Sequence, residues 1–407
     1  MNARPGDVHA TQAQPEAERQ ACPVCGGKHT LPFLVRDNVP VHQNLVLPNQ
    51  DSAVAVSLGD LDMQVCKDCG FVFNAAFDLA RLSYGRDYDN TQSHSAVFDA
   101  YLDKLVEQMV QQHGVRNARI VEVGCGKGHF LRKLTAYPGA GNTGFGFDPS
   151  YVGPDTDLDC ALQFRRSFYD SSCTDVPADV VVCRHVIEHV PAPLQLLGAV
   201  RAALDSQSAA RVFFETPCVE WILRNQVIWD FFYEHCSLFS RDALRHAFEA
   251  SGFVVHGVEQ VFGGQYLWLH AGVAQSKSHA VAAPNAAPLA ALAESYGHCL
   301  ETLCLGWRSR LAELRRQGPV ALWGAGAKGV TLANLVDPQR EWIDCLVDIN
   351  PAKQGCFVPG SGHPIVAPAA LLSRRVAHVI LMNPNYARET LQWLEAGRCP
   401  AKLLDWS

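Results

Sequence analysis

The sequence predicts a multidomain α/β protein: a doubly wound parallel sheet preceded by a small four-cysteine module and followed by a smaller α/β domain. Three observations predict this arrangement. Two C-x-x-C pairs lie near the N-terminus, apolar strands alternate with helices from Arg119 to about Val273, and a second strand–glycine–helix pattern begins at Pro319. Alternating strands and helices favour a parallel sheet with helices on both faces. A chain of 407 residues is also too long for a single core.

Composition narrows the class of protein and its partners. The chain is 48% hydrophobic and 18% charged, with a formal net charge of −7, which gives no general attraction to nucleic acids or anionic membranes. No apolar stretch approaches the roughly 18 residues of a membrane helix, and residues 1–20 lack a signal-peptide pattern. We therefore expect a cytoplasmic protein, monomeric or homodimeric, without nucleic-acid or membrane partners.

The N-terminal part of the chain predicts a metal-binding module. Residues 1–20, rich in Ala, Gln, Glu and Pro, are expected to form a disordered leader, and residues 21–85 to form the module. Two residues between paired thiolates let each pair chelate one ion, and four thiolates complete the coordination sphere of a structural zinc. A redox dithiol is the alternative, which two matched pairs disfavour. The pairs are Cys22 and Cys25 in CPVCGG, and Cys66 and Cys69 in CKDCGF.

The central domain, expected over residues 86–275, opens with a helix within Ser93–Gln112 and then a glycine turn typical of S-adenosylmethionine (SAM) binding. Glycines let the backbone approach a ligand, and the helix that follows presents free N–H groups. The strand before the turn ends in an acidic residue suited to the methionine ammonium, and the next strand ends in an Asp that can accept both ribose hydroxyls. These candidates are Glu122, Gly124, Gly126, Gly128 and Asp148.

Two further cofactor contacts are expected at the carboxyl ends of later strands. Phe168 follows the third strand and is a candidate for the adenine ring, although an ordinary core aromatic remains an equal alternative. Arg184 begins RHVIEHVPAP after the fourth strand, where ligands of doubly wound sheets bind. In the same loop we expect His189 to be functional, whereas His185 is interpreted as a packed loop residue.

The segment WDFFYEHCSLFS places three consecutive polar groups, Tyr233, Glu234 and His235, in an aromatic stretch. Burying a carboxylate and an imidazole is costly unless they are paired or serve a purpose. We therefore predict that Glu234 pairs with a histidine and raises its basicity. The alternative is a buried hydrogen-bonded network that holds the loop.

The C-terminal part is expected to hold a linker and helix over residues 276–315 and a Rossmann-like substrate domain over residues 316–407. In WGAGAKG, Gly324, Gly326 and Gly329 form G-x-G-x-x-G after a strand, and Asp348 ends the next strand. Alone, this is a dinucleotide fingerprint and supports an NAD(P)-binding alternative. About ninety residues are few for a full dinucleotide fold, so a half-fold that binds a nucleotide diphosphate is favoured.

Taken in order, these motifs resemble the deoxysugar C-methyltransferase family from about Ala21 to Trp406, most specifically in VDINPAKQGCFVPGSGHPI. The resemblance implies SAM-dependent methylation of a carbon beside a keto group, on a sugar carried by a nucleoside diphosphate, usually thymidine diphosphate. It further implies His235 as the base and Glu234 as the neighbouring acid, with His189 lining the sugar pocket. Tyr233, His189 or Lys328 would stabilise an enolate oxygen. The expected substrate-binding residues are Gly326, Lys328, Asn350 and Lys353.

Two features depart from that family pattern. The turn reads EVGCGKGHF where the sugar enzymes tend toward an N-D-G ending, and Tyr233 stands where they often have another histidine. Both suggest a sister branch whose acceptor is open. An O- or N-methyltransferase of another small biosynthetic metabolite and a nucleotide-binding module without activity remain as alternatives.

Overall fold

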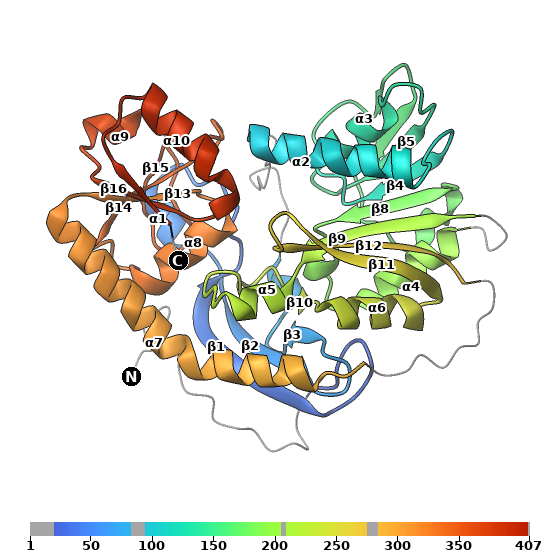
Figure 1. Ribbon diagram of the computed structural model, residues 1–407, viewed down its shortest axis with the longest axis horizontal. Helices are drawn as coiled ribbons and strands as arrows, with labels where there is room; N and C mark the ends of the chain where they lie inside the picture. The colour runs from blue at the N-terminus through green and yellow to red at the C-terminus, as the bar shows by residue number, and fades with distance from the viewer. Residues whose placement is uncertain (1–19, 83–93, 205–208, 275–283, 406–407) are drawn as a thin grey trace.

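The structure is a computed structural model that describes residues 20–82, 94–204, 209–274 and 284–405 (Figure 1). The expected leader, the boundary at residues 85 and 86 and most of the linker after residue 275 lie outside these ranges. Within the described residues, the chain forms an antiparallel N-terminal sheet, a central mixed sheet and a parallel C-terminal sheet. None of the helices in these ranges is long and apolar enough to cross a membrane.

The N-terminal sheet has the order β1-β2-β3-β10, and its last strand comes from the central part of the chain. Ser237 and Leu238 of β10 pair with Phe73 and Val72 of β3. The module is therefore completed by the residues that directly follow the YEH segment. The bounds are β1 Thr30–Pro40, β2 Leu58–Cys66, β3 Val72–Asn74 and β10 Ser237–Leu238, with α1, Gln50–Val54, between β1 and β2.

The central sheet confirms the predicted doubly wound architecture. Its order is β11-β12-β9-β8-β4-β5-β7-β6, and β4 (Arg119–Val123) pairs in parallel with β5 on one side and β8 on the other. The connections diverge at β4, which creates a crevice at its carboxyl end. The other strands are β5 Thr143–Phe147, β6 Thr156–Asp157, β7 Leu162–Arg165, β8 Val180–Arg184, β9 Arg211–Pro217, β11 Phe253–Val261 and β12 Tyr266–Val273.

Helices cover both faces of the central sheet (Figure 1). On one face, Leu102 of α2 and Leu131 of α3 join a buried cluster with sheet residues. On the other face, Leu197 of α4 and Phe248 of α6 join a second cluster. Burial of apolar residues on both sides explains why the parallel strands are almost uniformly hydrophobic. The helices are α2 Ala96–Glu107, α3 His129–Thr135, α4 Pro193–Ala203 and α6 Arg241–Ala250.

The C-terminal sheet is fully parallel, in the order β15-β14-β13-β16-β17. It is the expected small α/β unit, and a short strand, β17, follows its last helix. The strands are β13 Val320–Trp323, β14 Ile343–Val347, β15 Ile365–Val366, β16 His378–Leu381 and β17 Lys402–Leu404; the helices are α8 Ala327–Val336, α9 Ala370–Ser373 and α10 Ala387–Ala396.

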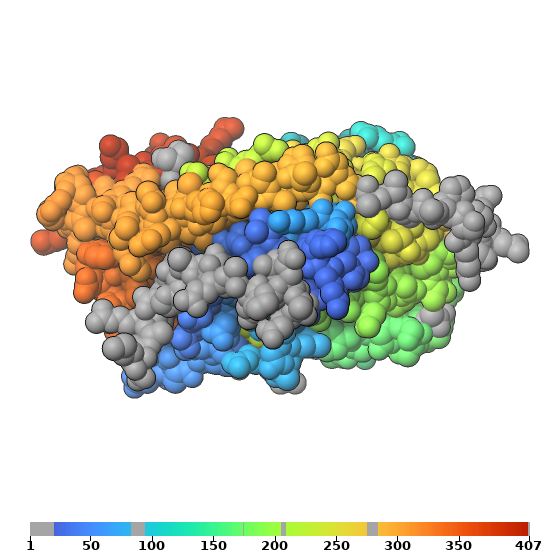
Figure 2. Space-filling view, turned by 90° about the horizontal axis from the view of Figure 1, so that it is seen from below, coloured from blue at the N-terminus to red at the C-terminus, as the bar shows by residue number. Residues whose placement is uncertain are grey.

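The long helix α7, Ala287–Gln317, connects the outer parts of the molecule. It runs along the N-terminal strands and reaches the C-terminal domain (Figures 1 and 2). Its buried stripe includes Tyr296, Leu300 and Trp307. Gly297 permits close packing, because a Cβ atom there would lie 2.5 Å from the carbonyl oxygen of Phe33 in β1. One core therefore joins the N-terminal module to the C-terminal domain.

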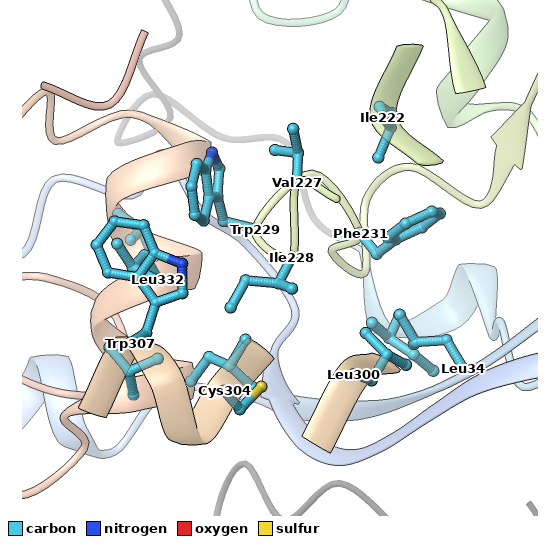
Figure 3. Close-up of a cluster of buried hydrophobic side chains, with 14 of the residues drawn as sticks. Leu34, Ile222, Val227, Ile228, Trp229, Phe231, Leu300, Cys304, Trp307 and Leu332 are labelled. Carbon is cyan, nitrogen blue, oxygen red and sulfur yellow. The ribbon is translucent and has the colours of Figure 1, made fainter. Parts of the chain in front are cut away.

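This shared core also holds the segment that precedes the YEH residues. Trp229 packs edge-on against Trp307 of α7, with ring centroids 5.3 Å apart. Phe231 lies near Leu34 and Leu300 (Figure 3). The apolar side chains of the module are thus buried in a core that they share with other parts of the chain. The short helix α5, Val219–Arg224, enters the same cluster.

Candidate active site

A cavity of about 290 Å³ lies between the central domain and the C-terminal domain. The carboxyl ends of β8 and β13 both open into it, so the two sheets contribute facing walls. The residues after β16 and Asn44 of the N-terminal module complete the lining. The predicted residues that line this cavity are His185, His189, Glu234, His235, Gly324, Gly326, Lys328, Gly329, Asp348, Asn350 and Lys353, and Glu188 also lines it.

His189 and His235 form the centre of the wall on the central-domain side. His189 ends a short 3₁₀ turn after β8, and its ring lies edge-on to that of His235, with centroids 4.9 Å apart. Burial lowers the pKa of His189. Burial, together with the nearby His189, His185 and Lys328, lowers the pKa of His235 well below 6.5. Both imidazoles are therefore neutral near pH 7, and a neutral imidazole can accept a proton.

Glu234 is fully buried. Its carboxylate accepts a hydrogen bond from the backbone N–H of Gln43, at 2.9 Å. His235 contacts the rings of His189 and Phe232. The prediction that Glu234 pairs with a histidine therefore stays a prediction, and the contact with Gln43 agrees with the alternative, a buried hydrogen-bonded network that holds the segment. Glu234 ties the YEH segment to the N-terminal module.

The predicted role of Tyr233 as a donor to an enolate oxygen is wrong. Its side chain is fully buried and does not line the cavity. The hydroxyl accepts a hydrogen bond from the backbone N–H of Asp78 at 2.8 Å and donates one to the Asp78 carbonyl at 3.1 Å. The ring packs so closely on Gly59 that a Cβ atom there would lie 2.3 Å away. Tyr233 therefore cannot serve as the donor to an enolate oxygen.

Lys328 projects from the first turn of α8 into the cavity, where it forms an ion pair with Asp230. Its ammonium also lies 5.6 Å from the ring centroid of Trp221. The sequence analysis missed Asp230, although this carboxylate stands in the same aromatic stretch as Glu234. Burying a charged side chain is costly unless it is paired or serves a purpose, and the same argument that singled out Glu234 applies to Asp230.

The glycine turn of the C-terminal domain presents the start of α8 to the cavity. Gly329 must lack a side chain, because a Cβ atom there would lie 1.9 Å from the Gly324 carbonyl oxygen. Asp348 holds the turn by accepting the N–H of Ala325 at 3.0 Å and that of Asn350 at 2.8 Å. The loop geometry of a nucleotide site is thus present, with free helical N–H groups at one end.

Two buried polar side chains flank this turn. The Nδ2 atom of Asn350 is buried without a hydrogen-bond partner among the described residues. Lys353, only 5% exposed, donates to Asn44 Oδ1 at 3.0 Å and to the Ala325 carbonyl at 3.1 Å. Asn44 was not identified from the sequence, because nothing local marks an N-terminal residue as a neighbour of the C-terminal domain.

The first glycine turn follows β4 and has the geometry of a cofactor loop. Gly124 has φ +68°, and a Cβ atom there would lie 2.1 Å from Val186. Gly126 and Gly128 also have positive φ, and the Cβ direction of Gly126 faces open space. The Gly126 N–H donates to Asp148 Oδ2 at 2.8 Å. The turn therefore leaves room for a ligand beside its backbone.

Glu122, under this turn, is buried, and its Oε2 atom has no hydrogen-bond partner among the described residues. Burial raises the pKa of Glu122 to about 8, although Arg184 opposes the rise. A buried carboxylate without a full set of partners is costly unless a cation completes it. The ammonium of SAM supplies such a cation, so the donor set fits this cofactor.

Comparison with known proteins agrees with this geometry. Residues 94–258 match the model of a methyltransferase domain, and residues 289–398 match that of a C-methyltransferase C-terminal domain. C-methyltransferase NovU of Streptomyces niveus is 26% identical over 401 residues, which cover 92% of this chain and 93% of NovU. The chain is a SAM-dependent methyltransferase.

Solved structures similar to the central domain of this methyltransferase include two enzymes. One is 1,6-didemethyltoxoflavin-N1-methyltransferase of Burkholderia thailandensis, with bound S-adenosylhomocysteine (14% identity, TM-score 0.34, covering 44% of this chain and 81% of the other). The other is magnesium protoporphyrin IX methyltransferase of Synechocystis PCC 6803 (14% identity, TM-score 0.35, covering 46% and 88%).

The structure bears on two further cofactor predictions for the methyltransferase. Arg184 was expected at the mouth of the cleft, but its side chain is only 9% exposed and its Nε atom donates to Glu215 Oε2 at 2.6 Å. Its guanidinium also covers the ring of Phe130, 4.6 Å from the centroid. Phe168 is 67% exposed, which excludes the core alternative and leaves the adenine contact as a prediction.

The four predicted cysteines come together as one cluster. Cys22 Sγ lies 3.6 Å from Cys69 Sγ, and Cys25 Sγ lies 3.5 Å from Cys66 Sγ. All four sulfurs lie within 4.8 Å of one another. A tetrahedral zinc–thiolate site requires sulfur separations of about 3.8 Å, whereas a disulfide requires about 2 Å. The thiols fit zinc and leave no ligand position for a substrate.

Glu188, His189 and His235 form another group whose ligand atoms lie within 4.8 Å of one another. Both carboxylate oxygens of Glu188 are already engaged, since Oε1 lies 3.2 Å from His185 Nδ1 and Oε2 accepts the Thr216 hydroxyl at 3.1 Å. A metal would have to displace these partners. The group is better suited to moving protons than to holding an ion.

Proposed function

We propose that this methyltransferase methylates a carbon beside a keto group, in a sugar carried by a nucleoside diphosphate. One observation carries the proposal: a single cavity has His189 and His235 on one wall and the Gly324–Gly329 turn on the other. A nucleotide held at the second wall would place its attached group against the histidines. The C-methyltransferase name of NovU supports carbon as the acceptor.

The C-terminal wall suits a diphosphate. The N-terminus of α8 offers backbone N–H groups and a positive dipole end, which favour phosphate oxygens. Asn350 Nδ2 adds a donor that has no partner among the described residues, and Lys353 adds a positive charge.

The central wall suits removal of a proton from carbon. His235 is neutral near pH 7 because its pKa is lowered, so a ring nitrogen can accept the proton. The C–H electron pair then forms the enolate double bond, and the carbonyl π pair moves onto oxygen. SAM, when bound, supplies an electrophilic methyl group whose bonding pair leaves with sulfur. His235 finally releases its proton to solvent.

A lowered pKa also makes His235 a weak base. The enolate must therefore be stabilised by cations or donors near its oxygen. Lys328 lies in the cavity, and its ammonium can turn from Asp230 toward the enolate oxygen. His189 offers a second imidazole beside His235.

Deuterium exchange tests the enolate step without methyl transfer. The wild-type protein, incubated in D₂O with S-adenosylhomocysteine and a thymidine-diphosphate-linked keto-deoxysugar, should incorporate deuterium beside the carbonyl. His235→Ala should abolish exchange while keeping cofactor affinity; His256→Ala, at an exposed position on β11, is the matched control. Absence of exchange in the wild-type protein would favour an O- or N-methyltransferase.

We also propose that the four-cysteine cluster binds a structural zinc ion. The thiols lie at the spacing of a tetrahedral site, and the cluster sits at the end of the sheet that carries β10. Zinc there would support the strands that hold the catalytic segment. It would supply folding energy and take no part in the chemistry.

A further inference from the structure

Residues 383–389, between β16 and the first turn of α10, join the C-terminal domain to the central domain beside the cavity. The side-chain amides of Asn383 and Gln265 form two reciprocal hydrogen bonds, of 2.8 and 3.1 Å, and both side chains are buried. Asn385 Nδ2 donates to the Phe262 carbonyl at 2.8 Å. Asn383 and Gln265 also line the cavity. The two domains are therefore held together at the place where they enclose it.

Glu389 makes a further contact of this kind, because its carboxylate caps the N-terminus of α2 in the central domain. Oε1 accepts the Ala96 backbone N–H at 2.8 Å, and Oε2 accepts the Ser95 hydroxyl at 2.8 Å. As the N-cap residue, Ser95 in turn accepts the Phe98 N–H at 3.2 Å. A carboxylate is favoured there, since the first N–H groups of a helix lack intrahelical partners and the helix dipole is positive at this end. Thus α2 receives part of its cap from another domain.

The first turn of α2 contacts the helix that follows the cofactor turn. Asp99 Oδ1 lies 2.7 Å from His129 Nε2, and His129 is the first residue of α3, directly after Gly128. Lys133, one turn further along α3, pairs with Asp99 at 3.0 Å and with Asp103 at 2.6 Å. The helix α2 therefore braces the helix whose N-terminus forms one end of the cofactor turn.

Tyr101 of α2 reaches the charged side chains under the same turn. Its hydroxyl donates to Glu215 Oε1, and Glu215 Oε2 accepts Arg184 Nε at 2.6 Å. The guanidinium of Arg184 in turn favours the charged form of Glu122, the carboxylate that suits the ammonium of SAM. The ring of Tyr101 also lies 4.8 Å from that of Phe262, whose carbonyl accepts the hydrogen bond from the C-terminal domain. A chain of contacts thus leads from the C-terminal domain through α2 to the cofactor site.

We infer that Glu389 is a positioning residue for the cofactor. By capping α2 from the C-terminal domain, its carboxylate holds Asp99 against α3 and Tyr101 against Glu215, and so keeps the cofactor turn in the shape that binds SAM. Loss of a cap destabilises the first turn of a helix, and Asp99 lies in that turn. The inference concerns the cofactor site alone and does not depend on the identity of the acceptor.

Isothermal titration with S-adenosylhomocysteine, combined with amide hydrogen exchange, tests this role. Glu389→Ala should raise the Kd about fivefold, the fold-change that corresponds to the loss of one helix cap. Exchange of the Ala96 and Phe98 amides should accelerate in the same variant. Glu395→Ala, at an exposed position at the other end of α10, is the matched control and should leave both quantities unchanged. A wild-type Kd in Glu389→Ala would overturn the inference.

A double-mutant cycle tests the route through α2. Tyr101→Phe removes the hydroxyl contact with Glu215, and the double variant with Glu389→Ala should raise the Kd by less than the product of the two separate factors. Independent, multiplicative effects would show that Glu389 does not act through this contact and would overturn the route. A raised Kd without faster exchange of the Ala96 amide would overturn it as well.

A second variant keeps the test decisive if Glu389→Ala does not fold. Glu389→Gln preserves the shape of the side chain and one acceptor oxygen, so it should raise the Kd by a smaller factor than Ala; a wild-type Kd would again contradict the role of Glu389. Neither measurement uses the acceptor substrate. Failure of this inference therefore leaves the proposed function untouched, and failure of the deuterium-exchange experiment leaves this inference in place.

Discussion

Replacing Glu122 with Gln should strengthen the ligand-free fold and weaken cofactor binding. Glu122 is buried under the glycine turn, and burial raises its pKa from 4.5 to about 8. The folded protein therefore holds a proton that the unfolded chain releases between these pH values. As a result, stability is highest below pH 4.5 with respect to this group and falls as pH rises toward 8. Gln is uncharged and removes this penalty.

The size of the effect follows from the displacement of the pKa. A pH of 7 lies about 2.5 units above the pKa of the carboxyl in the unfolded chain, and each unit corresponds to about 1.4 kcal/mol. Keeping Glu122 protonated in the folded protein therefore costs about 3 kcal/mol. For binding, the ionised fraction of Glu122 rises from about one tenth at pH 7 to about nine tenths at pH 9. A cofactor ammonium that requires the carboxylate should therefore bind about tenfold more tightly at pH 9.

Isothermal titration with S-adenosylhomocysteine over pH 6.5–9, combined with thermal denaturation, measures both effects. The variant Glu122→Gln also serves as the control for titration of the ligand, because protonation or deprotonation of the ligand's ammonium affects binding to both proteins equally. Only the difference between the two proteins reports on Glu122. Equal affinities and equal pH dependence in the two proteins would refute the placement of the ammonium at this carboxylate.

Three further substitutions test structural roles. Tyr233→Phe should cost about 1 kcal/mol, because water can replace the lost partner at the exposed Asp78 backbone; deuterium exchange should be unchanged, and a 100-fold loss would restore Tyr233 to the chemistry. Cys66→Ser should lose bound zinc, measured by atomic absorption, and lower the melting temperature; a folded, zinc-free variant of wild-type stability would contradict a structural metal. Trp229→Ala should destabilise the protein by about 3–5 kcal/mol by leaving a cavity beside Trp307, as measured by urea denaturation, and a loss below 1 kcal/mol would contradict its place in the core.

The motifs that lie in consecutive residues were predictable. The turn after β4, the turn after β13 and the C-x-x-C pairs each encode their geometry locally, through glycine, strand patterning and thiol spacing. The doubly wound sheet follows from the same alternation of strands and helices. The candidate cofactor, the clustering of the four cysteines and the general position of His189 and His235 could therefore be read directly from the chain.

The direction of each side chain was decided by tertiary contacts. Tyr233, Glu234 and His235 are consecutive, but they lie in an irregular segment without a 2.0 or 3.6 residue period. The segment is held between β10 and the cluster around Trp229. As a result, Tyr233 contacts Asp78 and Glu234 contacts Gln43. Glu234 and His235 line the cavity, whereas Tyr233 does not. No local pattern specifies this division.

The same reason explains His185 and Asn44. His185 gains its carboxylate partners from a left-handed twist and from β9, a strand that lies elsewhere in the sequence. Asn44 reaches Lys353 because the N-terminal module packs directly on the C-terminal domain, where Leu47 bridges Phe357. The sequence by itself determined the parts and the cofactor turn; only the packing of three sheets around one long helix decided which residues share the cavity.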